Sequence, residues 1–345
     1  MSLLGGCMPF ELAVRTVERL LELELPAKTE QRVTQRIGQE LEVQQQEVIR
    51  RAWEDYSLPA MEEAAPPTTL YVSTDGAQLH LQDQYHEAKV GAFYESELRS
   101  SVQGETKWHA TDTTYVAAVD EPAEEFARRV LVEGYRRGWD QAERVVVLGD
   151  GAPWNWTHVS AQVPDGVQKI EVADFFHAQE RLWDVGKAVF GEGTERTRQW
   201  AEAQGEVLLQ GGVEQVIQSL ESLWLQCGES RERLSTLGDE KAQDLPEPQK
   251  TPRENWIYFT RNRQRMRYDE YRRQGLFIGS GTVESACKRL VSARLKQSGM
   301  RWSKEGAHQV LQVRAAILSA RDRWGQFWAH RHPAPRHHHR RAEAA

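Results

Sequence analysis

The run from residue 144 to residue 150, Arg-Val-Val-Val-Leu-Gly-Asp, is the feature that most constrains the fold of this chain. Its apolar residues are continuous instead of alternating with polar ones. A strand of this kind is expected where both faces of a sheet are covered. The run therefore predicts a fully buried strand in an α/β fold, with Asp150 directly after it.

Four other segments have the residue types of strands, namely residues 70–75, 90–98, 113–119 and 168–174. Between the third of these and the buried run, residues 123–139 have the apolar period of a helix. Residues 152–162 are expected to form a short helix before the last strand. Three strands, a helix, a strand, a helix and a strand predict a mixed five-stranded sheet flanked by helices.

Helical patterns precede this core. Residues 9–24 place apolar side chains at helical spacing, Pro26 breaks that helix, and Thr29 is expected to cap a second one. Two short helices round a tight turn are typical of either a helix-turn-helix or an ordinary helical hairpin. A net charge near −5 over residues 1–66 favours the hairpin. Residues 58–68 contain several prolines and are expected to be a linker.

The C-terminal part is expected to be helical. From residue 177 to about residue 274 the strand signals are absent, and a glycine-rich turn over residues 278–284 then leads into helices expected over 283–296 and 304–327. The predicted organisation is a helical N-terminal region (1–57), a linker (58–69), the first part of the core (70–177), an all-α insertion (178–276), C-terminal helices that complete the core (277–330) and a disordered basic tail (331–345).

The composition excludes several classes of protein. No apolar run approaches the roughly 20 residues of a membrane-spanning helix, and the N-terminus lacks the basic start and apolar core of a signal peptide. Cys7, Cys227 and Cys287 form no CxxC pair, so neither a disulfide framework nor a cysteine-built zinc site is expected. No GxxxxGK[ST] motif occurs, and a nucleotide cofactor is not expected. A cytoplasmic protein fits these observations.

The formal net charge of −7 conceals a strong asymmetry. Residues 253–345 contain 20 basic and 7 acidic residues, a local balance of about +13, whereas the rest of the chain is acidic. Such asymmetry suggests that the basic part binds a polyanion, usually nucleic acid; a solvated Arg-rich helical surface is the alternative. The basic residues expected to contact DNA phosphates are Arg261, Arg263, Arg265, Arg267, Lys288, Arg289, Arg294 and Lys296.

Three acidic residues stand out by their positions. Asp75 and Asp150 each end an apolar strand before a glycine, and Glu284 lies in the first turn of the helix after the glycine-rich turn. Sites in α/β sheets usually lie at strand ends. Hard oxygen ligands with open positions suit Mg²⁺ or Mn²⁺, and two such ions can promote attack by water or a 3′-hydroxyl on a phosphodiester.

Each of these residues also has an ordinary structural interpretation. A strand-end aspartate is often a turn or cap residue, and Glu284 can complement the dipole of its helix. His177 is either a cap or core residue or one that approaches the scissile phosphate or orients Asp150. Aromatic residues at helical spacing are most often core residues, although one can stack on a base. The insertion contains four such tryptophans, Trp183, Trp200, Trp224 and Trp256.

This order of strands and acids resembles the ribonuclease H-like catalytic core of DDE transposases. Several families of that kind also carry an acid or Cys, two residues and a His after the fifth strand, as in Asp174-Phe-Phe-His177. Over about residues 70–328 the motifs are similar to those of bacterial insertion-sequence transposases of the ISKra type. They are Ser73-Thr-Asp-Gly76, Leu148-Gly-Asp-Gly-Ala-Pro-Trp-Asn155, Gly279-Ser-Gly-Thr-Val-Glu-Ser-Ala-Cys-Lys288 and Arg294-Leu-Lys-Gln-Ser-Gly-Met-Arg-Trp302.

The resemblance implies an enzyme that hydrolyses a phosphodiester at an element end and joins the freed 3′-hydroxyl to target DNA. It implies that Asp75, Asp150 and Glu284 form the metal-binding triad, with Mg²⁺ or Mn²⁺ as the cofactor and His177 as a further catalytic residue. DNA is then the expected partner, at transposon ends and target, with a homo-oligomer in the DNA complex. The expected location is the cytoplasm, in association with the nucleoid.

One departure from the family concerns the N-terminus. Relatives of this kind usually carry a longer N-terminal region, often with paired cysteines for zinc and a helix-turn-helix that finds the transposon ends. This chain has Cys7 alone there, which suggests a truncated copy and puts end recognition in doubt. Two alternatives to an active transposase therefore stay open: an inert remnant that only binds DNA or self-associates, and a ribonuclease H-like nuclease without strand transfer.

Overall fold

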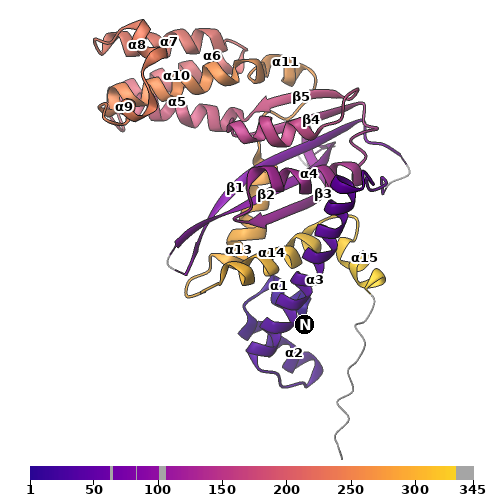
Figure 1. Ribbon diagram of the computed structural model, residues 1–345. Coiled ribbons are helices and arrows are strands. Elements are labelled where there is room, and N and C mark those ends of the chain that lie inside the picture. Colours follow the sequence, from indigo (N-terminus) through magenta and orange to yellow (C-terminus); the bar gives the residue numbers. More distant parts are fainter. Residues whose placement is uncertain (63–64, 83, 101–105, 332–345) are drawn as a thin grey trace, which may run out of the picture.

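Five strands form one mixed sheet in the computed structural model, which describes residues 1–62, 65–82, 84–100 and 106–331 (Figure 1). The order is β3-β2-β1-β4-β5; β1, β2 and β3 pair antiparallel, whereas β1, β4 and β5 pair parallel. The strands span Thr69–Leu81 (β1), Gln84–Ser100 (β2), Thr106–Val119 (β3), Arg144–Gly149 (β4) and Gln168–Ala173 (β5). The predicted α/β class with a mixed five-stranded sheet flanked by helices is confirmed.

Strand β4 is covered on both faces, as its continuous apolar run predicts. Val145 and Val147 belong to a core cluster with residues of α4 (Ala123–Arg136). Val146 and Leu148 point to the opposite face and belong to a second cluster with the helices that follow β5. Because side chains alternate between the faces of a strand, a run of four buried apolar residues requires this double cover.

Strand β1 is longer than predicted. Its pairing with β4 ends at Ser73 opposite Leu148, but its antiparallel pairing with β2 continues to Leu81 opposite Gln84. The prediction that the first strand ends at Asp75 is therefore wrong. The segment after Asp75 keeps strand character because apolar residues alternate with polar ones and are buried at every second position.

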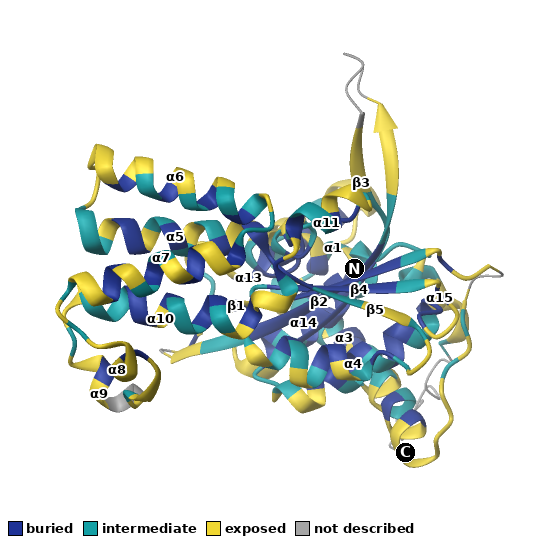
Figure 2. Cartoon of the chain, turned by 90° about the horizontal axis from the view of Figure 1, so that it is seen from above, coloured by how far each residue is buried: buried dark blue, intermediate teal, exposed yellow. Residues whose placement is uncertain are grey.

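Strands β2 and β3 also extend beyond the predicted segments. They pair from Ala88 opposite Val119 to Ser100 opposite Thr106, with an irregularity between Phe93 and Glu95. Figure 2 shows that the far end of this pair projects from the body of the protein and is largely exposed. Because this part of the strand pair is exposed to water, its residues are often charged and lack the apolar pattern by which the sequence predicts a strand.

The chain between β5 and the C-terminal helices is helical throughout, as predicted for the insertion. Figures 1 and 2 show α5, α6, α7 and α10 side by side in a bundle that extends away from the sheet. The helices are α5 (Phe175–Phe190), α6 (Glu195–Leu209), α7 (Val213–Gln226), α8 (Arg231–Thr236), α9 (Asp239–Gln243), α10 (Glu247–Asn262) and α11 (Tyr268–Arg273).

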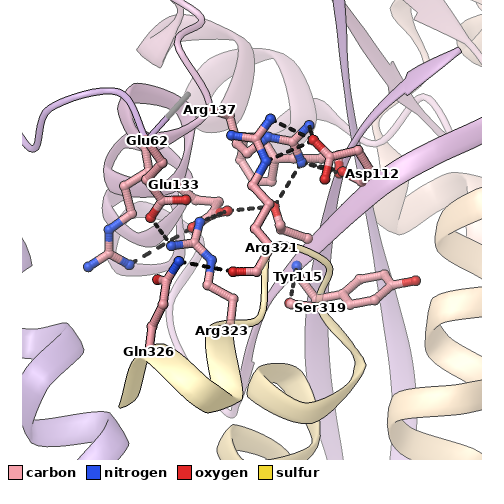
Figure 3. Close-up of polar contacts among 12 residues, drawn as sticks. Glu62, Asp112, Tyr115, Glu133, Arg137, Ser319, Arg321, Arg323 and Gln326 are labelled. Atoms are coloured by element: carbon pink, nitrogen blue, oxygen red, sulfur yellow. Dashed lines mark hydrogen bonds and ion pairs between the residues drawn. The ribbon is translucent and has the colours of Figure 1, made fainter. Parts of the chain in front are cut away.

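The two helices predicted near the C-terminus are each interrupted. The first consists of α12 (Gly281–Ala286), a π-helical turn (Cys287–Ser292) and α13 (Ala293–Leu295); the second consists of α14 (Lys304–Leu318) and α15 (Arg323–His330). The second break has a clear cause: the Ser319 hydroxyl accepts a hydrogen bond from Tyr115 N of β3 at 2.9 Å, and Arg321 adopts a φ of 61° (Figure 3). The chain leaves the helix there to bind the edge of the sheet.

The N-terminal region contains α1 (Ser2–Cys7), α2 (Phe10–Leu21) and α3 (Ala27–Glu54). Helix α1 was not predicted. The prediction that Thr29 caps the later helix is wrong, because the N-cap is Pro26 and no side chain caps that end. Helix α3 crosses α14 closely: a Cβ on Gly38 would lie 2.0 Å from the Gln309 carbonyl oxygen, so only glycine fits there.

Two expectations concern the C-terminal tail and membrane-spanning helices. Of the expected tail, only Arg331 is among the described residues, so its predicted disorder lies outside what the structure describes. Within the described part of the chain, every helix is too short or too polar to cross a membrane.

One buried carboxylate joins the sheet, the insertion and the C-terminal helices. Asp174, which is fully buried after β5, caps α5 by accepting hydrogen bonds at Oδ1 from Phe176 N (2.6 Å) and His177 N (3.1 Å). Its Oδ2 accepts hydrogen bonds from the backbone N–H and the hydroxyl of Ser280, directly before α12. Its own N–H donates to Gly149 O at the end of β4. Three segments distant in sequence therefore meet at Asp174.

Replacement of Asp174 by Ala is expected to lower the free energy of unfolding by about 3 kcal/mol, because a helix cap and the bonds to Ser280 are lost together. Urea unfolding followed by circular dichroism measures the change. Ser230→Ala removes the cap of α8, a single hydrogen bond from Arg233 N, and is expected to cost only about 1 kcal/mol. Equal losses in the two variants would contradict a special role for Asp174.

Candidate functional site

The two predicted aspartates lie where the parallel pairing of the neighbouring inner strands β1 and β4 ends. Asp150 directly follows β4, and Asp75 lies on β1 two residues after the parallel pairing of Ser73 with Leu148 ends. His177 lies in the first turn of α5, which follows the adjacent strand β5. The charges of Asp150 and His177 both act on Asp75, so the structure brings these three predicted residues into one neighbourhood.

Asp75 is a carboxyl group in an unfavourable place for a charge. Burial raises its pKa above the usual value, and the charge of Asp150 raises the pKa further. Hydrogen bonds from Gly76 N–H, at 2.7 Å, and from the Cys287 thiol lower it, as does the charge of His177. The net direction of the pKa is upward, and burial is its largest cause.

Asp150 is held in place by a buried amide that links the two acidic strands. Its Oδ1 accepts hydrogen bonds from Ala152 N (2.9 Å) and from Asn155 Nδ2 (2.8 Å). The carbonyl oxygen of the Asn155 side chain accepts a hydrogen bond from the Thr74 hydroxyl at 2.8 Å. Thr74 precedes Asp75, so Asn155, which is fully buried, fixes the positions of both acids.

Asn155 was missed as a positioning residue by sequence reasoning. It occurs in the motif after the buried strand, where the sequence predicts only a short helix. The predicted short helix is present, as a π-helical turn, Asn155–Val159, followed by a 3₁₀ turn, Ser160–Gln162. A second π-helical turn, Cys287–Ser292, follows the helix that carries Glu284. π-Helical turns are rare and occur frequently at functional sites, and here one lies beside Asp150 and the other begins at the residue that contacts Asp75.

The insertion supports the loop after β4. The Tyr258 hydroxyl donates a hydrogen bond to Asp150 O at 3.0 Å, and Asn262 Nδ2 donates to Gly151 O at 3.2 Å. Gly151 has a φ of 92°, and a Cβ there would lie 2.5 Å from the Tyr258 ring. Helix α10 therefore fixes the backbone of the Asp150 loop, and only glycine allows the close approach.

Glu284 approaches this neighbourhood without completing it. It is half-buried in α12, and its charge acts on Cys287. Burial, followed by the charges of Asp75 and Glu284, raises the pKa of the Cys287 thiol far above its usual value. Among the residues that the structure describes, however, no three His, Cys, Asp or Glu side chains form a group that could hold a metal ion. The aspartate pair has the oxygen chemistry that Mg²⁺ prefers, but the third ligand is not assembled with it.

His177 is neither a cap nor a core residue. Its backbone N–H is capped by Asp174, and its side chain is 46% exposed with Nδ1 3.6 Å from Glu180 Oε2. Both ordinary interpretations of this residue are therefore wrong. An exposed imidazole beside Asp75 leaves an approach to a bound group open.

The basic residues at the end of α10 differ in their availability. Arg261 and Arg263 are exposed. Arg265 donates from Nε to Glu171 Oε2 at 2.5 Å and lies over the Trp156 ring, 4.6 Å from its centroid. Arg267 is exposed, with Nη1 3.2 Å from Glu270 Oε2. The first two are the freer cations for a phosphate backbone.

Arg294 does not reach the surface, unlike Lys288, Arg289 and Lys296, which are exposed. Its guanidinium lies between the rings of Phe10 and Trp302, 4.6 and 4.9 Å from their centroids, and Nε donates to Gly5 O at 3.0 Å. Burial lowers its pKa to about 10. The expectation that Arg294 contacts DNA phosphates is corrected: in this conformation it fastens the N-terminus instead.

Three of the four tryptophans of the insertion, Trp200, Trp224 and Trp256, pack in the core. Trp224 is fully buried and donates from Nε1 to Ser230 O at 2.8 Å. Trp183, Trp200 and Trp256 are half-buried within the bundle. None of the four is an exposed aromatic surface.

A cavity of about 730 Å³ lies away from the acids, between α3, β3, α4, α14 and α15. Its wall includes the buried carboxylate of Glu133, which accepts hydrogen bonds from Arg323 Nη2 (2.8 Å) and from the Thr114 hydroxyl (2.5 Å). Figure 3 shows Arg137 and Arg321 on Asp112 beside this pair. Matched charges hold the C-terminal helices to the sheet here.

Comparison with known proteins gives no family for this chain: no protein-family model matches it, and no curated protein matches it. Any functional conclusion depends on the site and its chemistry.

Replacement of Asp75 by Asn is expected to stabilise the protein at pH 7 in the absence of divalent cations. Because the folded-state pKa of Asp75 is raised, the folded protein binds the proton more tightly than the unfolded chain, whose pKa is about 3.9. The stability from this carboxyl is complete below that value and is lost as the pH rises through the folded-state pKa. Unfolding measured from pH 7 down to pH 4 should show the gain shrinking.

Asp165, in the exposed turn before β5, is the matched control. Asp165→Asn should leave stability nearly unchanged across this pH range. If Asp75→Asn were less stable than the wild type at pH 7, the surroundings of Asp75 would stabilise its negative charge. That result would contradict a raised folded-state pKa.

Proposed function

We propose that this chain is a DDE-type transposase with a ribonuclease H-like core, which hydrolyses a phosphodiester at the ends of an insertion sequence and transfers the freed strand to target DNA. The observation that carries the proposal is the pair Asp75 and Asp150, coupled by charge on neighbouring strands β1 and β4. The strand order β3-β2-β1-β4-β5 and the helical insertion before Glu284 support it.

Asp75, Asp150 and Glu284 are proposed to hold Mg²⁺ or Mn²⁺, which would supply charge stabilisation and a lower pKa for the attacking water or hydroxyl. In the hydrolytic step a water oxygen attacks phosphorus, the bond to the 3′ oxygen breaks, and that oxygen leaves as a 3′-hydroxyl. In the joining step this 3′-hydroxyl attacks a phosphorus of the target strand and loses its proton as the new P–O bond forms. The bond from that phosphorus to the target's own 3′ oxygen breaks, and this oxygen leaves as a 3′-hydroxyl.

The chain's own residues support this chemistry by orientation. Asn155 holds Asp150 and, through Thr74, the strand that carries Asp75. Groups that are already oriented lower the activation free energy, because less entropy is lost when the transition state forms. His177, which is exposed beside Asp75, is proposed to approach the scissile phosphate.

The proposed partner is DNA, bound by a homo-oligomer. Exposed cations on α10, the turn after it and the helical segment after Glu284 support a phosphate path past the acids. They are Arg261, Arg263, Arg267, Lys288, Arg289 and Lys296. Such contacts position DNA without reading its sequence.

One observation favours a second candidate, a remnant that binds DNA without cleaving it. Glu284 does not form a group of three with the aspartates among the described residues, and an active metal site needs its third ligand. Cleavage and joining assays with Mg²⁺, on duplexes taken from the DNA that flanks the gene, separate the candidates. Cleavage with joining supports the transposase, cleavage alone a nuclease, and binding alone the remnant.

Replacement of Asp150 by Asn preserves shape and the hydrogen bonds to Ala152 and Asn155 but removes a negative charge. Strand cleavage in Mg²⁺ is expected to fall by about a thousandfold. DNA binding should survive or increase, because repulsion of the phosphates is relieved. Asp165→Asn, in an exposed turn, is the control and should cleave normally. Parallel loss of binding and cleavage in Asp150→Asn would mean that the residue has a structural role.

Replacement of both Arg261 and Arg263 by Ala tests the phosphate path. Binding should weaken on all DNA sequences alike, and the slope of log affinity against log salt should fall by about 0.9 for each lost contact, because fewer counterions are released. A salt titration on flanking and random duplexes measures both effects. Arg15→Ala with Arg19→Ala, on the exposed face of α2, is the control pair. An unchanged slope would exclude this segment from the DNA path.

A further inference from the structure

Phe176 is an aromatic side chain exposed to solvent next to the candidate acids. It is 56% exposed at the start of α5, although burial of a phenylalanine side chain would stabilise the folded protein. Its neighbour Phe175 is buried in the core. The other strongly exposed aromatic residues of the described chain lie on α3 and the loop after it, on β2 and β3, and on α15. They are Trp53, Tyr56, Tyr85, Trp108 and Trp328.

The ring is held in a defined position instead of moving freely. The backbone N–H of Phe176 donates to Asp174 Oδ1 at 2.6 Å. The edge of its ring meets Phe175, with centroids 5.5 Å apart and an interplanar angle of 74°. On another side it lies against Gly279, where a Cβ would be 2.5 Å from the ring. A planar group held in this way loses little conformational entropy when it binds a ligand.

The ring of Phe176 is connected, through neighbouring residues, to the segments that carry all three acids. The next residue, His177, acts by its charge on Asp75. Asp174, which caps the helix end of Phe176, donates its N–H to Gly149 O, directly before Asp150. Gly279, which contacts the ring, belongs to the turn that leads into α12 and Glu284. The ring therefore lies at the end of strands β4 and β5 where Asp150 follows β4.

We propose that Phe176 is a stacking platform for an unpaired nucleobase of DNA, next to the phosphate that the aspartates address. This inference rests on the proposed function. Every base offers an aromatic face, and stacking on a protein ring does not require a particular sequence. An aromatic residue in this place would favour DNA whose strands are separated or whose base is turned out of the duplex at the cleaved position.

The surroundings of the ring favour a base over other occupants. A protein partner would need a contiguous apolar patch, but the residues next to Phe176 are the buried Phe175, the polar His177 and the glycine turn. A phosphate directly on the ring would face the negative charges of Asp75 and Asp150. A neutral, flat group meets neither obstacle, and Lys296, whose charge reaches Cys287, is available for the phosphate that follows it.

Binding of two short duplexes of the same arbitrary sequence tests the proposal. They differ only in whether one 2-aminopurine is paired or bulged, and EDTA prevents cleavage. The wild-type chain is expected to bind the bulged duplex about tenfold more tightly than the paired one. The fluorescence of the bulged 2-aminopurine should also change on binding. Phe176→Ala should abolish the preference and the fluorescence change, whereas Phe176→Trp should keep both.

Two further variants separate stacking from other effects. Phe176→Leu keeps an apolar side chain without a ring and should lose the preference, while Tyr85→Ala removes an exposed aromatic residue far from the acids and should keep it. A full preference in Phe176→Ala would overturn the proposal. An equal loss of affinity for both duplexes in Phe176→Ala would also overturn it. So would a preference retained by Phe176→Leu, because the contact would then require an apolar side chain and not an aromatic ring.

The readout does not depend on the proposed activity. If the chain fails to cleave any flanking DNA in Mg²⁺ but shows the Phe176-dependent preference, the transposase proposal fails and the stacking platform stands. If cleavage occurs and the preference is the same in Phe176→Ala and wild type, the stacking platform fails and the transposase proposal stands.

Discussion

The buried carboxylate of Asp174 is the interaction on which the arrangement of the site depends. It accepts hydrogen bonds from the first turn of α5 and from Ser280 before α12, and its own N–H binds the end of β4. Ser280 is 106 residues from Asp174, across the helical insertion, so chain connectivity alone does not bring these two segments together. The exposed functional candidates Phe176 and His177 lie in the first turn of the helix that Asp174 caps, so their positions depend on this one buried side chain.

A second constraint is the proximity of like charges. The folded protein keeps Asp75 in a partly buried place where the charge of Asp150 opposes its ionisation. Such an arrangement costs stability, and proteins retain it mainly where a bound cation or a chemical step benefits from it. Hydrogen bonds hold both acids in place. The Asn155 side chain bonds to Asp150 and to Thr74 on β1, and the Tyr258 hydroxyl donates to the backbone oxygen of Asp150.

Much of the fold follows from local patterns in the sequence, and the exceptions have physical reasons. The run of apolar residues before Asp150 predicts its strand and the double cover of its faces correctly. The end of β1 at Asp75 was predicted wrongly because the continuation depends on pairing with β2, and the helix break at Ser319 depends on the edge of β3. The burial of Arg294 between two rings and the bridging role of Asn155 are long-range contacts that no local pattern encodes. The positions of the aspartates were predictable; the incomplete approach of Glu284 was not.

The contacts of Arg294 and Arg314 with helix α1 have a consequence for how the chain folds. Arg294 donates to Gly5 O and Arg314 to Gly6 O, which joins residues 289 and 308 positions apart in sequence. Contacts that close such long loops form late, because the entropy of closure must be paid first. During synthesis on the ribosome, the first helices emerge well before the arginines that hold them. The surface of α1 that packs against α14 therefore stays uncovered until the segment that carries Arg314 has been made.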